Sequence, residues 1–123
     1  MSLPKPHRLR RRQDFHQVYQ HGKYHPGVNL ILRSLRHLPS STPENLPATR
    51  FGISVSQKVS KKAVVRNLLK RQLKASLRQL LPQIANGWSV VIGVRPSAQG
   101  CEYVEILREL EQLLTAAEVI DGH

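Results

Sequence analysis

FGISVSQKVSKKAVVRNLLKRQLK, residues 51–74, is the stretch in which the periodicity of the chain changes from that of a strand to that of a helix. Its first six residues, FGISVS, alternate between apolar and small side chains, which predicts a β-strand over residues 50–56. Beyond this strand, apolar residues recur every three or four positions from about Lys62 to Leu81, and Pro82 follows. This spacing predicts a long amphipathic helix soon after the strand.

Positive side chains line the polar face of the predicted helix. Arg66, Lys70, Lys74 and Arg78 recur every four residues, and no acidic residue occurs from 58 to 78. Cations four residues apart on a helix repel each other, which costs about 0.2–0.5 kcal/mol per pair. A helix that only faces water usually relieves this repulsion with glutamates, whereas a phosphate backbone neutralises the whole row. The pattern therefore favours a surface that binds a polyanion.

The net charge of the 123-residue chain is +11, and it is distributed unevenly. Residues 1–97 contain 18 basic and 2 acidic side chains, a balance of +16, whereas residues 98–123 have a balance of −5. A field of this strength on a small domain attracts polyanions, of which nucleic-acid backbones are the commonest. We therefore expect a nucleic-acid partner rather than a membrane surface.

Length and composition limit the remaining classes of protein. A chain of 123 residues fits one domain with a single core. No apolar run approaches the ~20 residues that span a bilayer, and the first residues do not read as a signal peptide. The single cysteine, Cys101, excludes an internal disulfide and a multi-cysteine zinc site. These observations predict a cytoplasmic protein.

Four further segments complete the predicted order helix–strand–strand–helix–strand–helix, an α/β (α+β) two-layer sandwich around a small mixed sheet. WSVVIGV, residues 88–94, is a nearly continuous apolar run, as expected of a strand buried on both faces. We expect the strands at 28–36 and 50–56 to pair antiparallel through a surface loop at 37–49. The other predicted helices cover about 14–21 and 102–117.

Both ends of the chain are expected to lie outside the core. Residues 1–12, MSLPKPHRLRRR, form an extended basic arm that can order on a phosphate surface. Residues 118–123 are expected to be a flexible tail.

Six histidines suggest a self-contained nuclease as an enzymatic alternative, but their surroundings do not favour it. His16, His21 and His25 lie in or beside the short first helix, with Asp14 as the nearest carboxylate and no third metal ligand. A two-metal nuclease needs clustered carboxylates, and residues 1–97 contain only two. We therefore predict no catalytic residue and no metal site in this chain.

Three segments of the chain, taken in order, resemble the protein subunit of bacterial ribonuclease P. They are RLRRRQDFHQVYQHGKY at 8–24, the strand-to-helix stretch at 51–74 and WSVVIGVRPSA at 88–98. The family carries an Arg-Asn-Arg core in its long helix, and Leu68 stands at the position of the second arginine. The resemblance implies a ribosomal-protein-S5-like sandwich with a left-handed crossover, which the usual handedness rule does not predict.

The same resemblance implies a single RNA-binding domain over residues 1–123 that assists a catalytic RNA in removing the 5′ leader of precursor tRNA. Its partners would be the ribonuclease P RNA and precursor tRNA, with no obligate protein partner. The catalytic centre would belong to the RNA, with Mg²⁺ bound mainly by the RNA and no organic cofactor. The chain would then be an accessory subunit of the endoribonuclease.

The resemblance also implies two sets of binding residues. Contact with the RNA subunit falls to Lys58, Lys61, Lys62, Arg66, Asn67, Lys70, Arg71 and Lys74. Contact with the leader falls to Phe15, Tyr19, Arg8, Arg10, Arg11, Arg12 and Arg33. Aromatic rings one helical turn apart can stack unpaired bases, but the spacing of Phe15 and Tyr19 alone fits a buried helix anchor equally well.

Two other binding functions remain open at this stage. A general RNA-binding or ribosome-associated protein without a role in cleavage would use the same basic helix, because phosphate contacts are generic. A DNA-binding protein that inserts the helix at 62–81 into a major groove is less favoured, because no helix-turn-helix pair precedes that helix.

Overall fold

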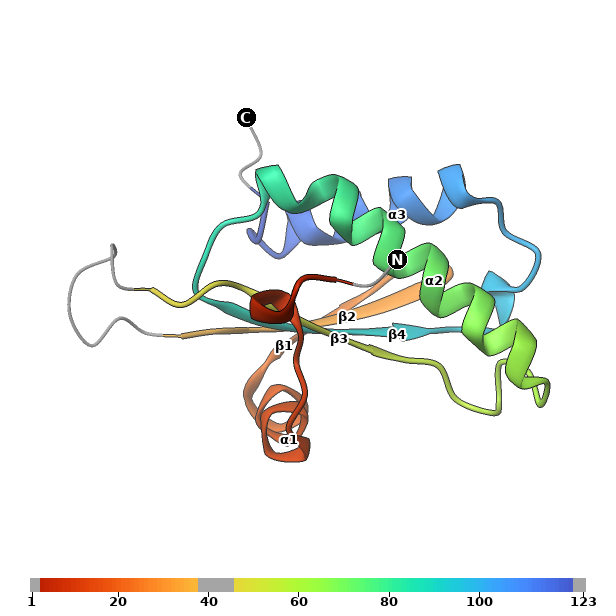
Figure 1. The fold of residues 1–123 in the computed structure, drawn as a ribbon, viewed down its shortest axis with the longest axis horizontal. Coiled ribbons are helices and arrows are strands. Elements are labelled where there is room, and N and C mark those ends of the chain that lie inside the picture. The colour runs from red at the N-terminus through yellow and green to blue at the C-terminus, as the bar shows by residue number, and fades with distance from the viewer. Residues whose placement is uncertain (1–2, 38–45, 121–123) are drawn as a thin grey trace.

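A four-stranded mixed sheet lies between helices in the computed structural model, which describes residues 3–37 and 46–120 (Figure 1). The strand order is β1-β2-β4-β3, with β3 parallel to β4 and the other neighbours antiparallel. The strands are β1 (Lys23–Pro26), β2 (Leu30–Arg36), β3 (Arg50–Ser54) and β4 (Trp88–Val94). The helices are α1 (Arg12–His21), α2 (Ala63–Leu80) and α3 (Tyr103–Ala116).

Helices α2 and α3 cover one face of the sheet, and α1 lies on the other (Figure 1). The main core forms where Leu73 and Leu77 of α2 meet Ile106 and Leu110 of α3 above the sheet. The α+β class and the small mixed sheet are confirmed, and α1 adds a partial cover on the second face. No helix in the described ranges combines the length and apolarity needed to cross a bilayer.

Strand β4 is buried on both faces, as its apolar run predicts. Val90 and Ile92 are 0% exposed and belong to the main core, whereas Val91, 1% exposed, packs with Val18 of α1 on the opposite face. The strand also pairs on both edges, with β2 along its whole length and with β3 from Ser89 to Gly93.

The predicted antiparallel pairing of the strands at 28–36 and 50–56 is wrong. β2 and β3 do not pair; β4 lies between them, because its apolar residues need cover on both faces and the centre of the sheet supplies it. A fourth strand, β1, pairs antiparallel with β2 and is absent from the predicted order. Its four residues, KYHP, are too few to show alternation. Of the predicted loop at 37–49, residues 38–45 lie outside the described ranges, and Thr49 is buried.

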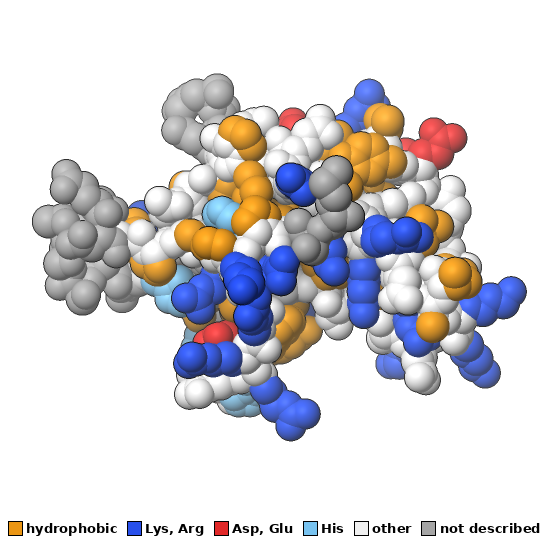
Figure 2. All heavy atoms as spheres, in the orientation of Figure 1, with side chains coloured by type: hydrophobic (Ala, Val, Ile, Leu, Met, Phe, Trp, Pro, Cys, Tyr) orange, Lys and Arg blue, Asp and Glu red, His pale blue; other side chains and the backbone are white. Residues whose placement is uncertain are grey.

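The N-terminal segment, residues 3–11, packs against the sheet and does not extend away from it. Leu3 and Leu9 are buried, and the backbone N–H of Leu9 donates to the carbonyl of Phe51 at 2.9 Å. The expectation that the basic arm lies outside the core is therefore wrong for Leu3 and Leu9, because these two leucines supply apolar area to bury. Figure 2 shows Lys and Arg side chains gathered on the face where this segment and α2 lie.

The C-terminal residues also pack. Val119 and Ile120 are buried, and Ile120 forms an isolated antiparallel bridge with Ile84. The predicted flexible tail is therefore wrong for residues 118–120, and residues 121–123 lie outside the described ranges.

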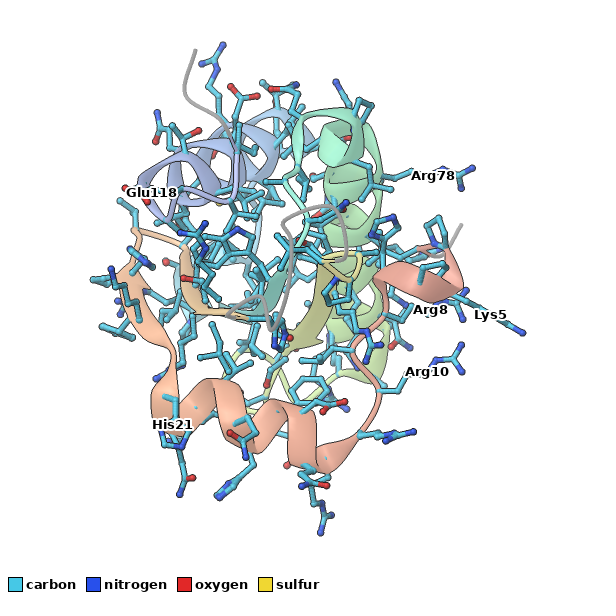
Figure 3. The ribbon with its side chains drawn as sticks, turned by 90° about the vertical axis from the view of Figure 1, so that its left-hand side faces the viewer. Lys5, Arg8, Arg10, His21, Arg78 and Glu118 are labelled. Atoms are coloured by element: carbon cyan, nitrogen blue, oxygen red, sulfur yellow. The ribbon has the colours of Figure 1, made fainter. Side chains whose placement is uncertain are left out.

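The connection from β3 through α2 to β4 joins two neighbouring parallel strands. With α2 above the sheet and both strands pointing away from the viewer, as in Figure 3, β4 lies to the left of β3. The crossover is therefore left-handed, against the strong preference for right-handed connections. The resemblance implies this handedness, which no local pattern of residues predicts.

The turn between β1 and β2 is held by one carboxylate of α3. Glu109 accepts hydrogen bonds from the backbone N–H groups of Asn29 at 2.8 Å and Leu30 at 2.6 Å, and from the Asn29 side chain at 3.0 Å. These bonds tie α3 to the edge of the sheet farthest from β3.

We expect Glu109→Ala to lower the free energy of unfolding by about 1–3 kcal/mol, because two backbone donors lose their partner. The matched control is Glu111→Ala, an exposed glutamate of the same helix. Urea denaturation of both variants measures the difference, and equal losses would contradict the assigned role of Glu109.

Candidate nucleic-acid interface

A groove with basic walls runs along the outer edge of β3, between α1 and α2. Lys70 and Lys74 of α2 form one wall, and Arg8 and Arg10 of the N-terminal segment form the other. Its floor is apolar, and none of the described residues that line it is acidic. We call this the edge groove, lined by Leu3, Arg8, Leu9, Arg10, Phe15, Phe51, Gly52, Ile53, Lys70 and Lys74.

The Phe15 ring in the edge groove lies directly on the backbone of β3. A Cβ atom added to Gly52 would lie 2.4 Å from Cζ of Phe15, so the absence of a side chain there makes room for the ring. Val18 is 0% exposed and anchors α1 on the sheet, while Phe15 remains half-buried. Phe15 therefore packs beside Val18 against the same buried cluster, but it is only partly buried and also lines the edge groove.

Arg33 of β2 lies over the rings of both Tyr19 of α1 and Tyr24 of β1. The guanidinium carbon of Arg33 lies 5.0 Å from the centroid of the Tyr19 ring and 5.0 Å from that of Tyr24. The two rings are 46% and 52% exposed, so they remain accessible beside the cation. Tyr24 is missing from the predicted site, because its place beside Arg33 depends on the pairing of β1 with β2.

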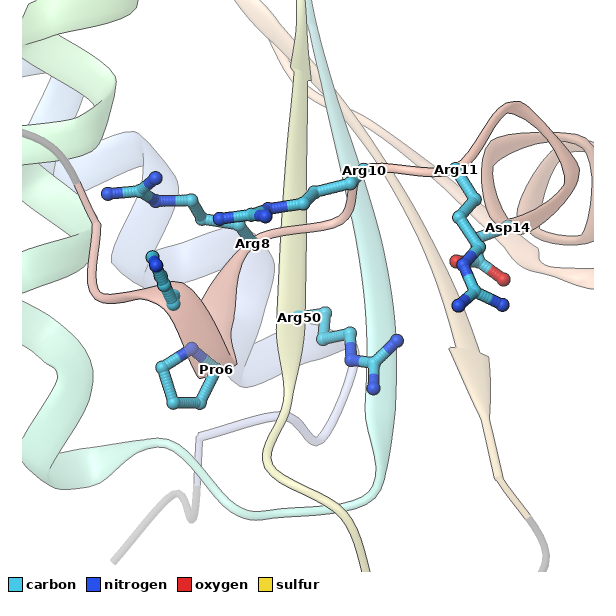
Figure 4. Close-up of a pocket in the computed structure, with 7 residues that line it drawn as sticks. Pro6, Arg8, Arg10, Arg11, Asp14 and Arg50 are labelled. Carbon is cyan, nitrogen blue, oxygen red and sulfur yellow. The ribbon is translucent and has the colours of Figure 1, made fainter.

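A second basic pocket adjoins the edge groove and shares Arg8 and Arg10 with it (Figure 4). Its lining residues are Lys5, Pro6, Arg8, Arg10, Arg11, Asp14 and Arg50. Arg50 and Lys5 are absent from the predicted site, since Arg50 meets these residues only because the N-terminal segment packs against β3. Arg12 lines neither pocket and is exposed at the start of α1.

The outer side of α2 presents the rest of the predicted RNA-subunit contacts. Asn67 and Arg71 are exposed on the helix, whereas Lys70 and Lys74 are half-buried in the edge groove. The Arg66 guanidinium donates to the carbonyl of Ser60 at 2.8 Å, which holds the side chain against the turn before α2. The three remaining lysines of the predicted set are exposed near this turn: Lys58, Lys61 and Lys62.

Apart from Asp14, which lines the adjoining pocket, the described acidic side chains lie away from the edge groove. Within the described ranges, every carboxylate except Asp14 belongs to residues 102–118, which comprise α3 and its ends. Figure 3 shows Arg8, Arg10 and Arg78 on one side of the molecule and Glu118 on the other. The groove therefore lies on a positively charged part of the surface, which attracts phosphates.

Two of the histidines serve the fold. A ring nitrogen of His7 lies 2.8 Å from the carbonyl of Thr49, and a ring nitrogen of His37 lies 2.7 Å from the Ser89 hydroxyl. In the described part of the chain, no three His, Cys, Asp or Glu side chains are grouped so that they could hold a metal ion.

The chain is similar to known proteins over nearly its whole length. The family model described as Ribonuclease P matches residues 3–118. The ribonuclease P protein component of Microcystis aeruginosa is 54% identical over 123 residues, which is all of both chains.

Solved structures match the fold. The RNase P protein of Staphylococcus aureus superposes with a TM-score of 0.79 at 25% identity, covering 95% of this chain and 100% of that one. The RNase P protein of Thermotoga maritima gives a TM-score of 0.75 at 25% identity, covering 89% of this chain and 96% of that one. With a family model spanning nearly the whole chain and a full-length relative at 54% identity, the chain belongs to the ribonuclease P protein family.

Proposed function

We propose that this chain is the protein subunit of ribonuclease P, which binds the catalytic RNA and the 5′ leader of precursor tRNA and assists removal of the leader. Membership of the family supports this role. The observation that carries it is the edge groove, in which four cations and an aromatic ring lie together without a carboxylate among the described lining residues.

The edge groove suits a single-stranded leader. Unpaired bases can stack on Phe15. The phosphates of the strand can then bind Lys70 and Lys74 on one wall or Arg8 and Arg10 on the other. Stacking contributes about 1–3 kcal/mol per base and tolerates any base, so leaders of different sequence can bind. Tyr19 and Arg33 extend this surface along α1 and β2.

The outer side of α2 suits the RNA subunit. Asn67 and Arg71 are exposed and do not line the edge groove, so α2 can contact RNA beyond the groove as well. Lys70 and Lys74, which the resemblance assigns to the RNA subunit, line the edge groove. We therefore assign them to the leader, and the outer contacts to the RNA subunit: Lys58, Lys61, Lys62, Arg66, Asn67 and Arg71.

In this proposal the chain neutralises phosphates and positions the leader. The cleavage itself belongs to Mg²⁺ ions bound mainly by the RNA, and neither an organic cofactor nor an obligate protein partner or membrane is required. High positive charge beside the RNA replaces bound counterions, which lowers the salt and Mg²⁺ that activity needs. The complex would act in the cytoplasm.

Single-turnover cleavage of a precursor tRNA tests the proposal. The reaction is run at low Mg²⁺ with a bacterial ribonuclease P RNA alone, with the protein alone and with both. Cleavage at the mature 5′ end only with both present supports the subunit role. Binding to RNA without any effect on cleavage would support the general RNA-binding alternative, and cleavage by the protein alone would support the nuclease alternative.

Phe15→Ala is expected to weaken binding of the holoenzyme to precursor tRNA about 10-fold, because one stacking surface is lost. Binding of mature tRNA, which has no leader, should not change. Gln20→Ala, an exposed substitution on the same helix, is the control. Equal losses for precursor and mature tRNA would argue against a leader contact at Phe15.

Lys70→Ala and Lys74→Ala are each expected to reduce the dependence of leader binding on salt. Each removed phosphate contact lowers the slope of log K against log salt concentration by about 0.7. The control is Arg108→Ala, which removes an exposed cation of α3 and should leave the slope unchanged. A titration series from low to physiological salt gives the slopes. Unchanged slopes for both variants would show that Lys70 and Lys74 do not contact the leader.

A further inference from the structure

Two apolar side chains are exposed on α2 beside its cationic residues. Val64 is 70% exposed and Leu68 is 49% exposed, and they lie one helical turn apart on the same side of the helix. We call this pair the apolar strip. A helix that gains its stability from packing usually keeps such side chains on its buried face, which here is formed by Leu69, Leu73 and Leu77.

Cations border the apolar strip. Arg71 lies one turn beyond Leu68, and the exposed Lys61 and Lys62 immediately precede the helix at the Val64 end. A second copy of the chain would bring its own cations against these residues, which disfavours self-association through the strip. RNA combines phosphates, which these cations attract, with base faces and ribose edges, which an apolar strip can cover.

We propose that the apolar strip is a docking surface for an unpaired nucleotide of the ribonuclease P RNA. The inference rests on the proposed function and adds to it a contact that is not a phosphate contact. The base or ribose of this nucleotide packs on Val64 and Leu68, and its flanking phosphates bind Arg71 and the lysines before α2.

Leu68 gives this contact its particular chemistry. Its position corresponds to the second arginine of the family's Arg-Asn-Arg core, where a guanidinium would add a phosphate contact. An aliphatic side chain releases no counterion on binding, so its contribution to affinity does not fall as salt rises. Part of the affinity for the RNA subunit should therefore persist at high salt.

The test measures affinity of the full-length protein for ribonuclease P RNA over a series of salt concentrations. Leu68→Ala is expected to weaken binding about 10-fold at every salt concentration, with the slope of log K against log salt unchanged. Leu68→Arg is expected to steepen the slope by about 0.7–0.9, because one phosphate contact is added. Val104→Ala, an apolar residue 53% exposed on α3, is the matched control and should bind as the unsubstituted protein does.

The outcomes separate the inference from the proposed function. If the unsubstituted protein does not bind this RNA, the proposed function fails. If it binds and Leu68→Ala binds equally tightly, or if Leu68→Ala changes the slope instead of the affinity, the apolar contact is overturned. Sedimentation of the free protein provides a further check. A dimer that Leu68→Ala dissociates would show that the apolar strip binds a second copy of the chain instead of RNA. Urea denaturation of each variant verifies that the fold is retained.

Discussion

Burial of β4 on both faces, together with its pairing on both edges, is the constraint on which the other elements depend. β2 and β3 belong to one sheet only because each pairs with β4. On one face, α2 and α3 pack in a core with Val90 and Ile92; on the other, α1 packs on Val91. With β4 at the centre, β3 becomes an edge strand. The N-terminal segment covers part of this edge, and the remaining space between α1 and α2 becomes the edge groove.

The edge groove depends on what its residues lack as much as on what they carry. Gly52 lacks a side chain, which allows the Phe15 ring to lie on β3, and the lining lacks a carboxylate among the described residues. Among the described lining residues, no carboxylate therefore competes with a phosphate inside the groove. In the proposed function, a single strand would stack its bases on the ring at the floor of the groove and place its phosphates against the cations of the walls.

Local patterns predict the elements well and their neighbours poorly. The alternation at 50–56 and the apolar run at 88–94 correspond to β3 and β4, because periodicity reports which sides of a segment are buried. Strand order, the left-handed crossover and the short β1 depend on long-range packing that no local pattern records. For the same reason the sequence indicates Phe15 and Lys70 separately, and only the packing around the β3 edge brings them into one groove with Arg10. Tyr24 and Arg50 likewise join their neighbours only through the strand register.

The separation of the carboxylates on α3 from the cations around the edge groove also gives the molecule an electric dipole. In the field of an RNA, such a dipole experiences a torque that turns the groove toward the phosphates before contact is made. A larger fraction of diffusional encounters then begins in a productive orientation, which raises the association rate at low ionic strength. The carboxylates of α3 therefore raise the rate of RNA association without contacting RNA, because the phosphates repel them and so orient the groove toward the RNA.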